Sequence, residues 1–134
     1  MKTRYAVALA LLAGAAIGSI GVGGLNAQGK APGAYVVLTY TELAADQAGY
    51  KEQVADKAQA IIEKYGGRFL VRASPSDITF LRPGDTPFPV KRWVLIGFDS
   101  VQQAKDWYNS PEAKPVMAYI DQHTKGRIFA VKAE

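Results

Sequence analysis

The order of its predicted elements places this sequence in the α+β class. Across 134 residues, β-branched and aromatic segments alternate with amphipathic ones in the order strand, helix, strand, short strand, strand, helix, strand. Two βαβ-like halves within about a hundred residues are typical of a ferredoxin-like βαββαβ sandwich, in which two helices cover one face of an antiparallel sheet. The segment Lys91–Phe98 is apolar on both faces, so the second face of the sheet also needs cover.

The first half of the domain contains a strand, a long helix and a second strand. The first strand is predicted over Ala34–Thr41, where β-branched and aromatic residues predominate. A helix follows over Ala45–Tyr65, with Asp46 placed to cap its first turn. Its apolar residues form one stripe at helical spacing: Tyr50, Val54, Ala58, Ile61, Ile62 and Tyr65. Gly66 is expected to end this helix in the left-handed conformation, and Arg68–Ala73 to be the second strand.

A turn-rich segment separates the second strand from the most apolar one. Asp77–Arg82 is predicted to be a short strand that could pair with its predecessor. Pro83–Pro89 contains three prolines and a glycine, so it is expected to be a loop rather than a central strand or a helix. Lys91–Phe98 is then the third main strand.

The last part of the chain is predicted to be a broken helix followed by a closing strand. Ser100 is suited to cap the start of this helix. Asn109-Ser110-Pro111 interrupts it, because the serine fits a cap and the proline fits the first position of a new helix. Pro115 should then kink or restart the helix. After a stop at Gly126, the closing strand is expected over Ile128–Lys132.

The N-terminal 27 residues have the composition of a secretory signal peptide. Lys2 and Arg4 form a basic start, and the first 27 residues contain no aspartate or glutamate. The uncharged run Tyr5–Leu25 is followed shortly by a small residue, Ala27, as at a cleavage site. Cleavage after Ala27 would leave a linker, 28–33, and a domain, 34–133, in a periplasmic or secreted protein. The alternative is a retained membrane anchor, since the uncharged run approaches the roughly 20 residues that span a bilayer.

Composition excludes several kinds of site. The chain has no cysteine, which removes disulfides, thiolate nucleophiles and thiolate metal ligands. The formal charge of +4 includes Lys2 and Arg4, so the mature domain carries +4 − 2 = +2 and has no lysine or arginine run that would bind nucleic acid. With one histidine and no acidic cluster, neither a metal site nor a cofactor is expected.

The predicted sheet has a second apolar face that two helices cannot cover. Trp93, Leu95, Leu70 and Phe129 would form a large exposed patch there, which soluble monomers avoid. A second copy of the chain, related by a two-fold axis, would cover it, so we expect a homodimer. The alternative is that the Pro83–Pro89 loop and the N-terminal linker fold over this face.

Two pieces of the sequence, Tyr65–Arg72 (YGGRFLVR) and Trp107–Glu112 (WYNSPE), carry a family resemblance. Together with AYVV, WVLIGFDS and GRIFAVK, they resemble a bacterial domain of unknown function in the dimeric α+β-barrel superfamily. The similarity spans about Ala34 to Ala133, and the long Pro83–Pro89 loop and Pro115 depart from it. The resemblance implies a ferredoxin-like subunit whose sheet packs on a partner's sheet. The superfamily includes cofactor-free monooxygenases, lactone isomerases, haem-handling enzymes and stress-response barrels, but the family brings no reaction with it.

Arg72 is the strongest candidate for binding a ligand, and Arg68 is the second. Strand alternation predicts that both arginines share one face, with Phe69 and Val71 turned to the helices. On that expectation the arginines face the interior of the barrel, where a guanidinium needs a carboxylate or an anionic ligand. The structural alternative is an internal salt bridge, or an edge position with the charged group in water.

Four further residues are weaker candidates. His123, the only histidine, could act as a base, although a cation at a helix end also has a purely electrostatic explanation. Tyr108 and Asn109 lie at the helix break, where Ser110 explains the interruption as a cap. Trp93 lies on the face that a partner would cover and could contact a ligand there.

Three functions are compatible with these patterns. The first is an exported dimer that binds a small apolar or aromatic ligand, with or without an anionic group, oriented by Arg72 and a tyrosine. The second is a cofactor-independent monooxygenase or isomerase, with Arg72 stabilising an enolate-like charge and His123 or a tyrosine moving a proton. The third is a non-catalytic assembly or stress protein with a closed core.

Overall fold

The computed structural model describes residues 30–85 and 89–134. The chain divides into two units, Met1–Ala31 and Pro32–Glu134, and the second contains the helices and strands reported below. The predicted signal peptide lies outside the described residues. None of the helices in the described part has the length and apolarity needed to cross a membrane.

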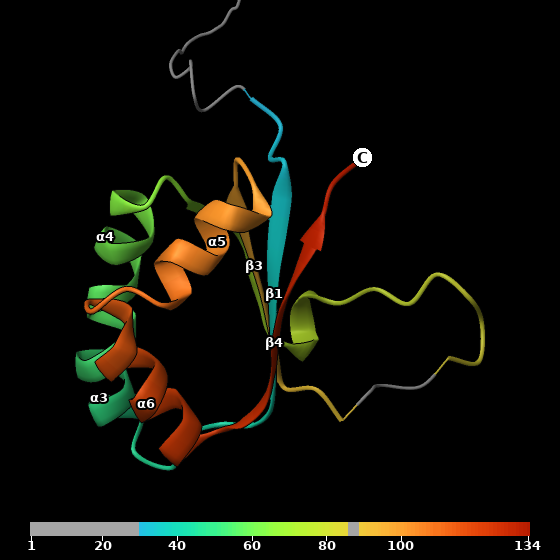
Figure 1. The fold of residues 1–134 in the computed structure, drawn as a ribbon. Helices are drawn as coiled ribbons and strands as arrows, with labels where there is room; N and C mark the ends of the chain where they lie inside the picture. Colours follow the sequence, from blue (N-terminus) through green and yellow to red (C-terminus); the bar gives the residue numbers. More distant parts are fainter. Residues whose placement is uncertain (1–29, 86–88) are drawn as a thin grey trace, which may run out of the picture. The chain divides into compact units, whose positions relative to one another are not determined.

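The second unit is built on one antiparallel sheet. Its strands are β1 (Ala34–Glu42), β2 (Arg68–Ala73), β3 (Arg92–Phe98) and β4 (Lys125–Lys132), in the spatial order β2-β3-β1-β4. Both βαβ-like connections place helices on the same side of the sheet (Figure 1). The ferredoxin-like arrangement predicted from the order of the elements is confirmed.

The predicted helix Ala45–Tyr65 consists of three consecutive helical segments. These are α3 (Gln47–Tyr50), the π-helical turn η1 (Lys51–Ala55) and α4 (Asp56–Lys64). The Asp46 carboxylate accepts a hydrogen bond from the amide of Gly49 at 2.9 Å, as expected for a cap. Gly66 has φ of +86°, so the predicted left-handed end of the helix is confirmed.

The broken second helix is α5 (Val101–Tyr108) followed by α6 (Ala113–His123). Ser100 caps α5 by accepting from the amide of Gln103 at 3.1 Å. Pro115 is the third residue of α6, in its first turn, and the helix continues through it to His123, so Pro115 does not break the helix. The closing strand begins at Lys125, earlier than predicted, so Gly126 is its second residue and does not end the helix. A side chain at Gly126 would collide with the Thr39 carbonyl, which explains the glycine.

The prediction of a short strand over Asp77–Arg82 is wrong. Ser74 and Asp77 instead form a capping box around the 3₁₀ turn η2 (Pro75–Asp77), and the chain continues without a strand. These local side-chain hydrogen bonds favour a turn over an extended ladder. Leu81, an apolar residue of the predicted strand, is 93% exposed and so contributes nothing to a core.

The core lies between the helices and the sheet. From the sheet it takes alternate residues, namely Val36, Leu38 and Tyr40 of β1 and Val94, Ile96 and Phe98 of β3. The helices contribute Val54, Ile62, Trp107, Val116 and Ile120. Burying each large apolar side chain contributes about 1.5–3 kcal/mol, so this layer supplies most of the folding free energy. The helices thus cover one face of the sheet only.

Candidate functional site

A β-bulge in β2 decides where Arg72 points. Phe69 pairs with Ile96, but Val71 pairs with the next residue of β3, Leu95, so Leu70 is an extra residue in the ladder. After the bulge the alternation is reversed, and Arg72 lies opposite Val94 on the helix-covered side. The prediction that Arg72 and Arg68 share one face is therefore wrong, because period-two alternation does not continue across a bulge.

The bulge brings Arg72 to the same side as Phe69. The guanidinium carbon lies 3.8 Å from the centroid of the Phe69 ring, a cation–π contact that orients the head group. Arg68 precedes the bulge, pairs with Gly97 and belongs to the opposite face. The two arginines predicted to act together thus belong to different environments.

A cavity of about 200 Å³ lies between the helices and the sheet. Its wall is largely aliphatic and aromatic, with residues from β1, β2, β3, the first helical stretch, α5 and α6. The polar side chains in the wall are two tyrosines and two arginines: Tyr40, Tyr50, Arg72 and Arg92. No aspartate or glutamate of the described residues lines it.

Tyr40 and Tyr50 form a phenol pair in this wall. Their hydroxyl oxygens are 2.8 Å apart, and their rings meet edge to face at 6.2 Å. Tyr40 is 1% exposed, and burial, followed by the hydrogen bond to Tyr50, raises the pKa of its hydroxyl well above the ordinary value. Tyr40 is therefore a neutral phenol at physiological pH and can donate a proton only in a hydrogen bond.

Arg92 joins this group from the neighbouring strand. It lies opposite Tyr40 in the β1–β3 ladder, on the helix-covered side. Its charge acts in the direction of a lower Tyr40 pKa, although burial outweighs it. Within the described residues, neither Arg92 nor Arg72 has a carboxylate in ion-pair contact.

Two departures from regular structure border the same cavity. The π-helical turn η1 follows Tyr50 directly and supplies Val54 and Ala55 to the wall. The bulge at Leu70 turns Arg72 toward it. Single π-turns and β-bulges are frequent next to functional sites because they redirect side chains that regular elements would aim elsewhere.

The remaining candidates from the sequence lie elsewhere. Tyr108 and Asn109 line a second, more open groove between α5 and β4, together with Phe129. His123 is exposed at the end of α6, where its Nδ1 lies 2.9 Å from the Tyr119 carbonyl and its ring stacks on the Tyr119 ring at 3.9 Å. Trp93 pairs with Thr39 and Ala73, on the face that the helices leave uncovered. None of these four residues lines the cavity.

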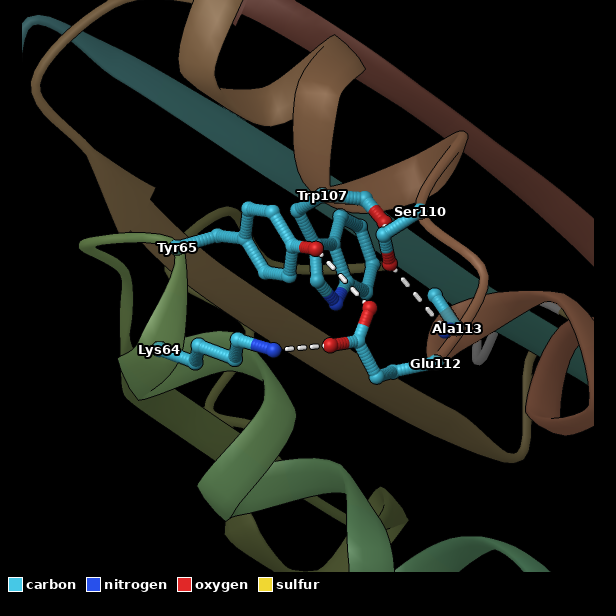
Figure 2. A network of polar contacts seen from close by, with 6 residues as sticks. All are labelled: Lys64, Tyr65, Trp107, Ser110, Glu112 and Ala113. Carbon is cyan, nitrogen blue, oxygen red and sulfur yellow. Dashed lines mark hydrogen bonds and ion pairs between the residues drawn. The ribbon is translucent and has the colours of Figure 1, made fainter.

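A polar junction joins the end of α4 to the α5–α6 turn (Figure 2). The Tyr65 hydroxyl donates to Glu112 at 2.8 Å, and Lys64 forms an ion pair with the same carboxylate. The hydrogen bonds from Lys64 and Tyr65 lower the pKa of Glu112 to about 2. Ser110 is buried, accepts from the Ala113 amide at 3.1 Å and donates to the carbonyl of Trp107 at 2.7 Å.

The junction explains the two most specific pieces of the sequence. Tyr65–Arg72 and Trp107–Glu112 meet here through side chains that bond to each other. Gly67 lies two residues after Tyr65 and must be small, because a Cβ there would lie 2.5 Å from the Phe98 ring. The interpretation of Ser110 as a cap is confirmed, and Tyr65 and Glu112 have a structural role that needs no ligand, whereas Arg72, at the end of the first piece, lines the cavity.

Sequence reasoning missed Arg92 and the pairing of the two tyrosines. The available signal was the alternation of side chains between the two faces of the sheet along β1 and β3. Tyr40 is in phase with Leu38, and Arg92 is in phase with Val94 and Ile96, so both belong to the helix-covered face. A tyrosine and an arginine continuing two apolar rows indicate polar groups at the end of a buried layer.

Solved structures of one protein, RPA0582, share this fold at low sequence identity. RPA0582, a protein of unknown function from Rhodopseudomonas palustris, matches with TM-score 0.53 and 13% identity over 82% of this chain and 90% of its own. A methylated form of RPA0582 matches with TM-score 0.57 and 11% identity over 86% and 93%. A dimeric protein of unknown function with a ferredoxin-like fold, from Bacteroides fragilis NCTC 9343, matches with TM-score 0.44 and 12% identity over 75% and 95%.

No curated protein matches the sequence significantly. A family model matches residues 33–133, which is most of the chain and includes both pieces that carry the resemblance. The protein therefore belongs to the family described as Domain of unknown function (DUF1330), as the resemblance predicted.

Proposed function

We propose that this protein binds a small apolar or aromatic molecule between its helices and its sheet. The observation that carries the proposal is the largely apolar cavity of about 200 Å³ between the helices and the sheet. An apolar cavity of about 150 Å³ can hold benzene, so this one has room for a single ring with a short substituent. Ligand sites in proteins are commonly apolar hollows with a few convergent polar groups, which describes this wall.

The test is a binding screen with a blocked cavity as the reference. Small aromatic and branched aliphatic compounds are screened by ligand-observed NMR, and native mass spectrometry of the purified protein looks for a copurified molecule. Ala58→Phe fills the cavity from α4, whereas Ala60→Phe adds the same ring on the exposed side of α4. Binding should survive Ala60→Phe and be lost in Ala58→Phe; equal binding by both variants would refute the site.

We infer that a second copy of the chain covers the open face of the sheet. Phe129 and Val131 of β4 are 49% and 45% exposed there, and Trp93 and Leu95 belong to the same face on β3, with β1 between the two strands. The loop that follows η2 is on this side of the sheet (Figure 1), and Pro32 packs over Gly97, but neither removes this exposure. An apolar strip of this kind favours a two-fold sheet-to-sheet contact.

Sedimentation velocity tests the homodimer. Phe129→Lys should give monomers, because it places a charge in the apolar contact. Gln122→Lys adds the same charge on the exposed side of α6 and should leave the dimer intact. A wild-type protein that sediments as a monomer at all concentrations would refute the inference.

We further propose that the protein is exported and loses its first 27 residues. The support is the basic start, the uncharged run and the small residue at Ala27. The intact mass of the protein from the extracytoplasmic fraction should correspond to a chain beginning at Gln28. A full-length chain in the membrane fraction would favour the retained anchor instead.

A further inference from the structure

We propose that the cavity is selective for a carboxylic acid, whose carboxylate is held by Arg72 and Arg92 while its apolar body fills the interior. This inference rests on the proposed function and adds the chemical class of the ligand. It follows from four features of the wall: the position of the arginines, the absence of acidic partners among the described residues, the phenol pair and the apolar remainder.

The two arginines come from neighbouring strands and belong to the same side of the sheet. Arg72 lies opposite Val94, which is two residues after Arg92 on β3, so the arginines are diagonal neighbours across the β2–β3 ladder. Diagonal neighbours are about 7–8 Å apart at their backbones, within reach of one anion for side chains of this length. The bulge and the contact with Phe69 fix Arg72 on this side.

The cavity wall concentrates positive charge without neutralising it. Two guanidinium groups line it, no acidic residue of the described chain does, and neither guanidinium is in ion-pair contact. Elsewhere on the described surface, Arg82 and Lys51 have carboxylate partners. A planar guanidinium offers paired N–H donors that match the two oxygens of a carboxylate, so an anion of that shape completes the wall.

The phenol pair supplies a further hydrogen-bond donor. Two hydroxyls have two hydrogens, and the bond between Tyr40 and Tyr50 uses one of them. Neither hydroxyl has another hydrogen-bond partner among the described residues, so one O–H is available to an acceptor. Because Tyr40 stays neutral, this hydroxyl donates to a bound oxygen rather than repelling an anion.

The rest of the wall determines the body of the acid. It is formed by aliphatic and aromatic side chains such as Leu38, Ile61, Ile96 and Met117, which cannot satisfy further polar groups. A monocarboxylate with one ring or a short branched chain fits both the arginine end and the apolar interior of the cavity. Sugars and polycarboxylates do not, because they would bury unpaired hydroxyls or charges.

Calorimetry with matched pairs of probes tests this inference. Phenylacetate is compared with phenylacetamide, and 4-methylpentanoate with its amide, because each amide keeps the shape and lacks the charge. We expect each acid to bind about tenfold more tightly than its amide, the size of one charge-assisted hydrogen bond. This comparison uses the wild-type protein and needs no substitution.

Substitutions then assign the preference to the arginines. Arg72→Met and Arg92→Met should each lower the affinity for the acid and leave the affinity for the amide unchanged. Arg68→Met, on the same strand but the other face, is the matched control and should keep the preference. Arg92→Gln serves as a second variant if Arg92→Met does not fold.

The possible failures can be told apart. If the amides bind as tightly as the acids, or if neither acid binds, the carboxylate inference is refuted. If compounds of the wider screen still bind in a way that Ala58→Phe abolishes, the proposed binding function stands without it. If Ala58→Phe and wild type bind every compound equally, the proposed function itself fails.

Discussion

The polar junction and the cavity wall differ in whether their polar groups have partners among the described residues. At the junction, the Glu112 carboxylate accepts a hydrogen bond from the Tyr65 hydroxyl and forms an ion pair with Lys64. The Ser110 hydroxyl both donates and accepts a hydrogen bond. In the cavity wall, two arginines have no carboxylate among the described residues, and a pair of phenols retains one hydrogen to donate.

This difference separates structure from function. Matched polar groups fix how the helices meet and need nothing from outside the chain. Unmatched charges beside an apolar hollow add little to stability, and proteins retain such groups where a ligand completes them. Junction substitutions should therefore reduce stability, and cavity substitutions should reduce binding.

The largest effect is expected at Trp107, whose indole is buried beside the junction. Trp107→Ala should lower the free energy of unfolding by about 3–5 kcal/mol, because it empties a large part of the core. Tyr108→Ala, one residue later and exposed, is the control and should cost far less. Urea unfolding measures both, and similar losses for the two variants would contradict the placement of the core.

Ser110→Ala should have the next largest effect on stability. It removes the hydroxyl that serves both the Ala113 amide and the Trp107 carbonyl, at a buried position. The expected loss is about 1–2 kcal/mol, with affinity for phenylacetate unchanged. A variant as stable as wild type would show that the cap is not needed to join α5 and α6.

Arg72→Met should change stability little. Its guanidinium is in contact with Phe69, but within the described residues it has no ion pair to lose. We expect the free energy of unfolding to stay within about 0.5 kcal/mol of wild type or to rise. A large loss of unfolding free energy in urea would show that Arg72 stabilises the fold.

The smallest effect is the pH dependence of the junction. The pKa of Glu112 is lowered from 4.5 to about 2 in the folded protein, so its stabilising contribution is present above pH 4.5. That contribution should be lost as the pH falls from 4.5 toward 2. Glu112→Gln removes this contribution. The free energies of unfolding of wild type and Glu112→Gln should therefore differ at pH 4.5 and converge as the pH falls toward 2. Parallel curves would show that this carboxylate adds nothing.

Local patterns in the sequence predicted most of the fold. Asp46, Ser100 and Ser110 cap helices as their residue types indicate, and Gly66 ends one as expected. These signals are local, because a cap or a left-handed stop depends on a few neighbouring residues.

The cavity could be predicted only in part, because it depends on contacts between distant segments. Arg72 was identified as a candidate, but the bulge at Leu70 depends on the register of β2 against β3 and has no local signature. The same limit applies to the π-turn η1, which interrupts a stripe that reads as a regular helix. The tyrosine pair forms between β1 and the first helical stretch, so no spacing in the sequence indicates it.

The most direct measurement compares Arg72→Met with Ser110→Ala in the same two assays. Melting temperature and the dissociation constant for phenylacetate are determined for both variants and for wild type. We predict opposite outcomes: Arg72→Met melts like wild type and binds the acid weakly, whereas Ser110→Ala melts earlier and binds it normally. If both variants lose stability and affinity together, the separation between a structural junction and a binding cavity is wrong.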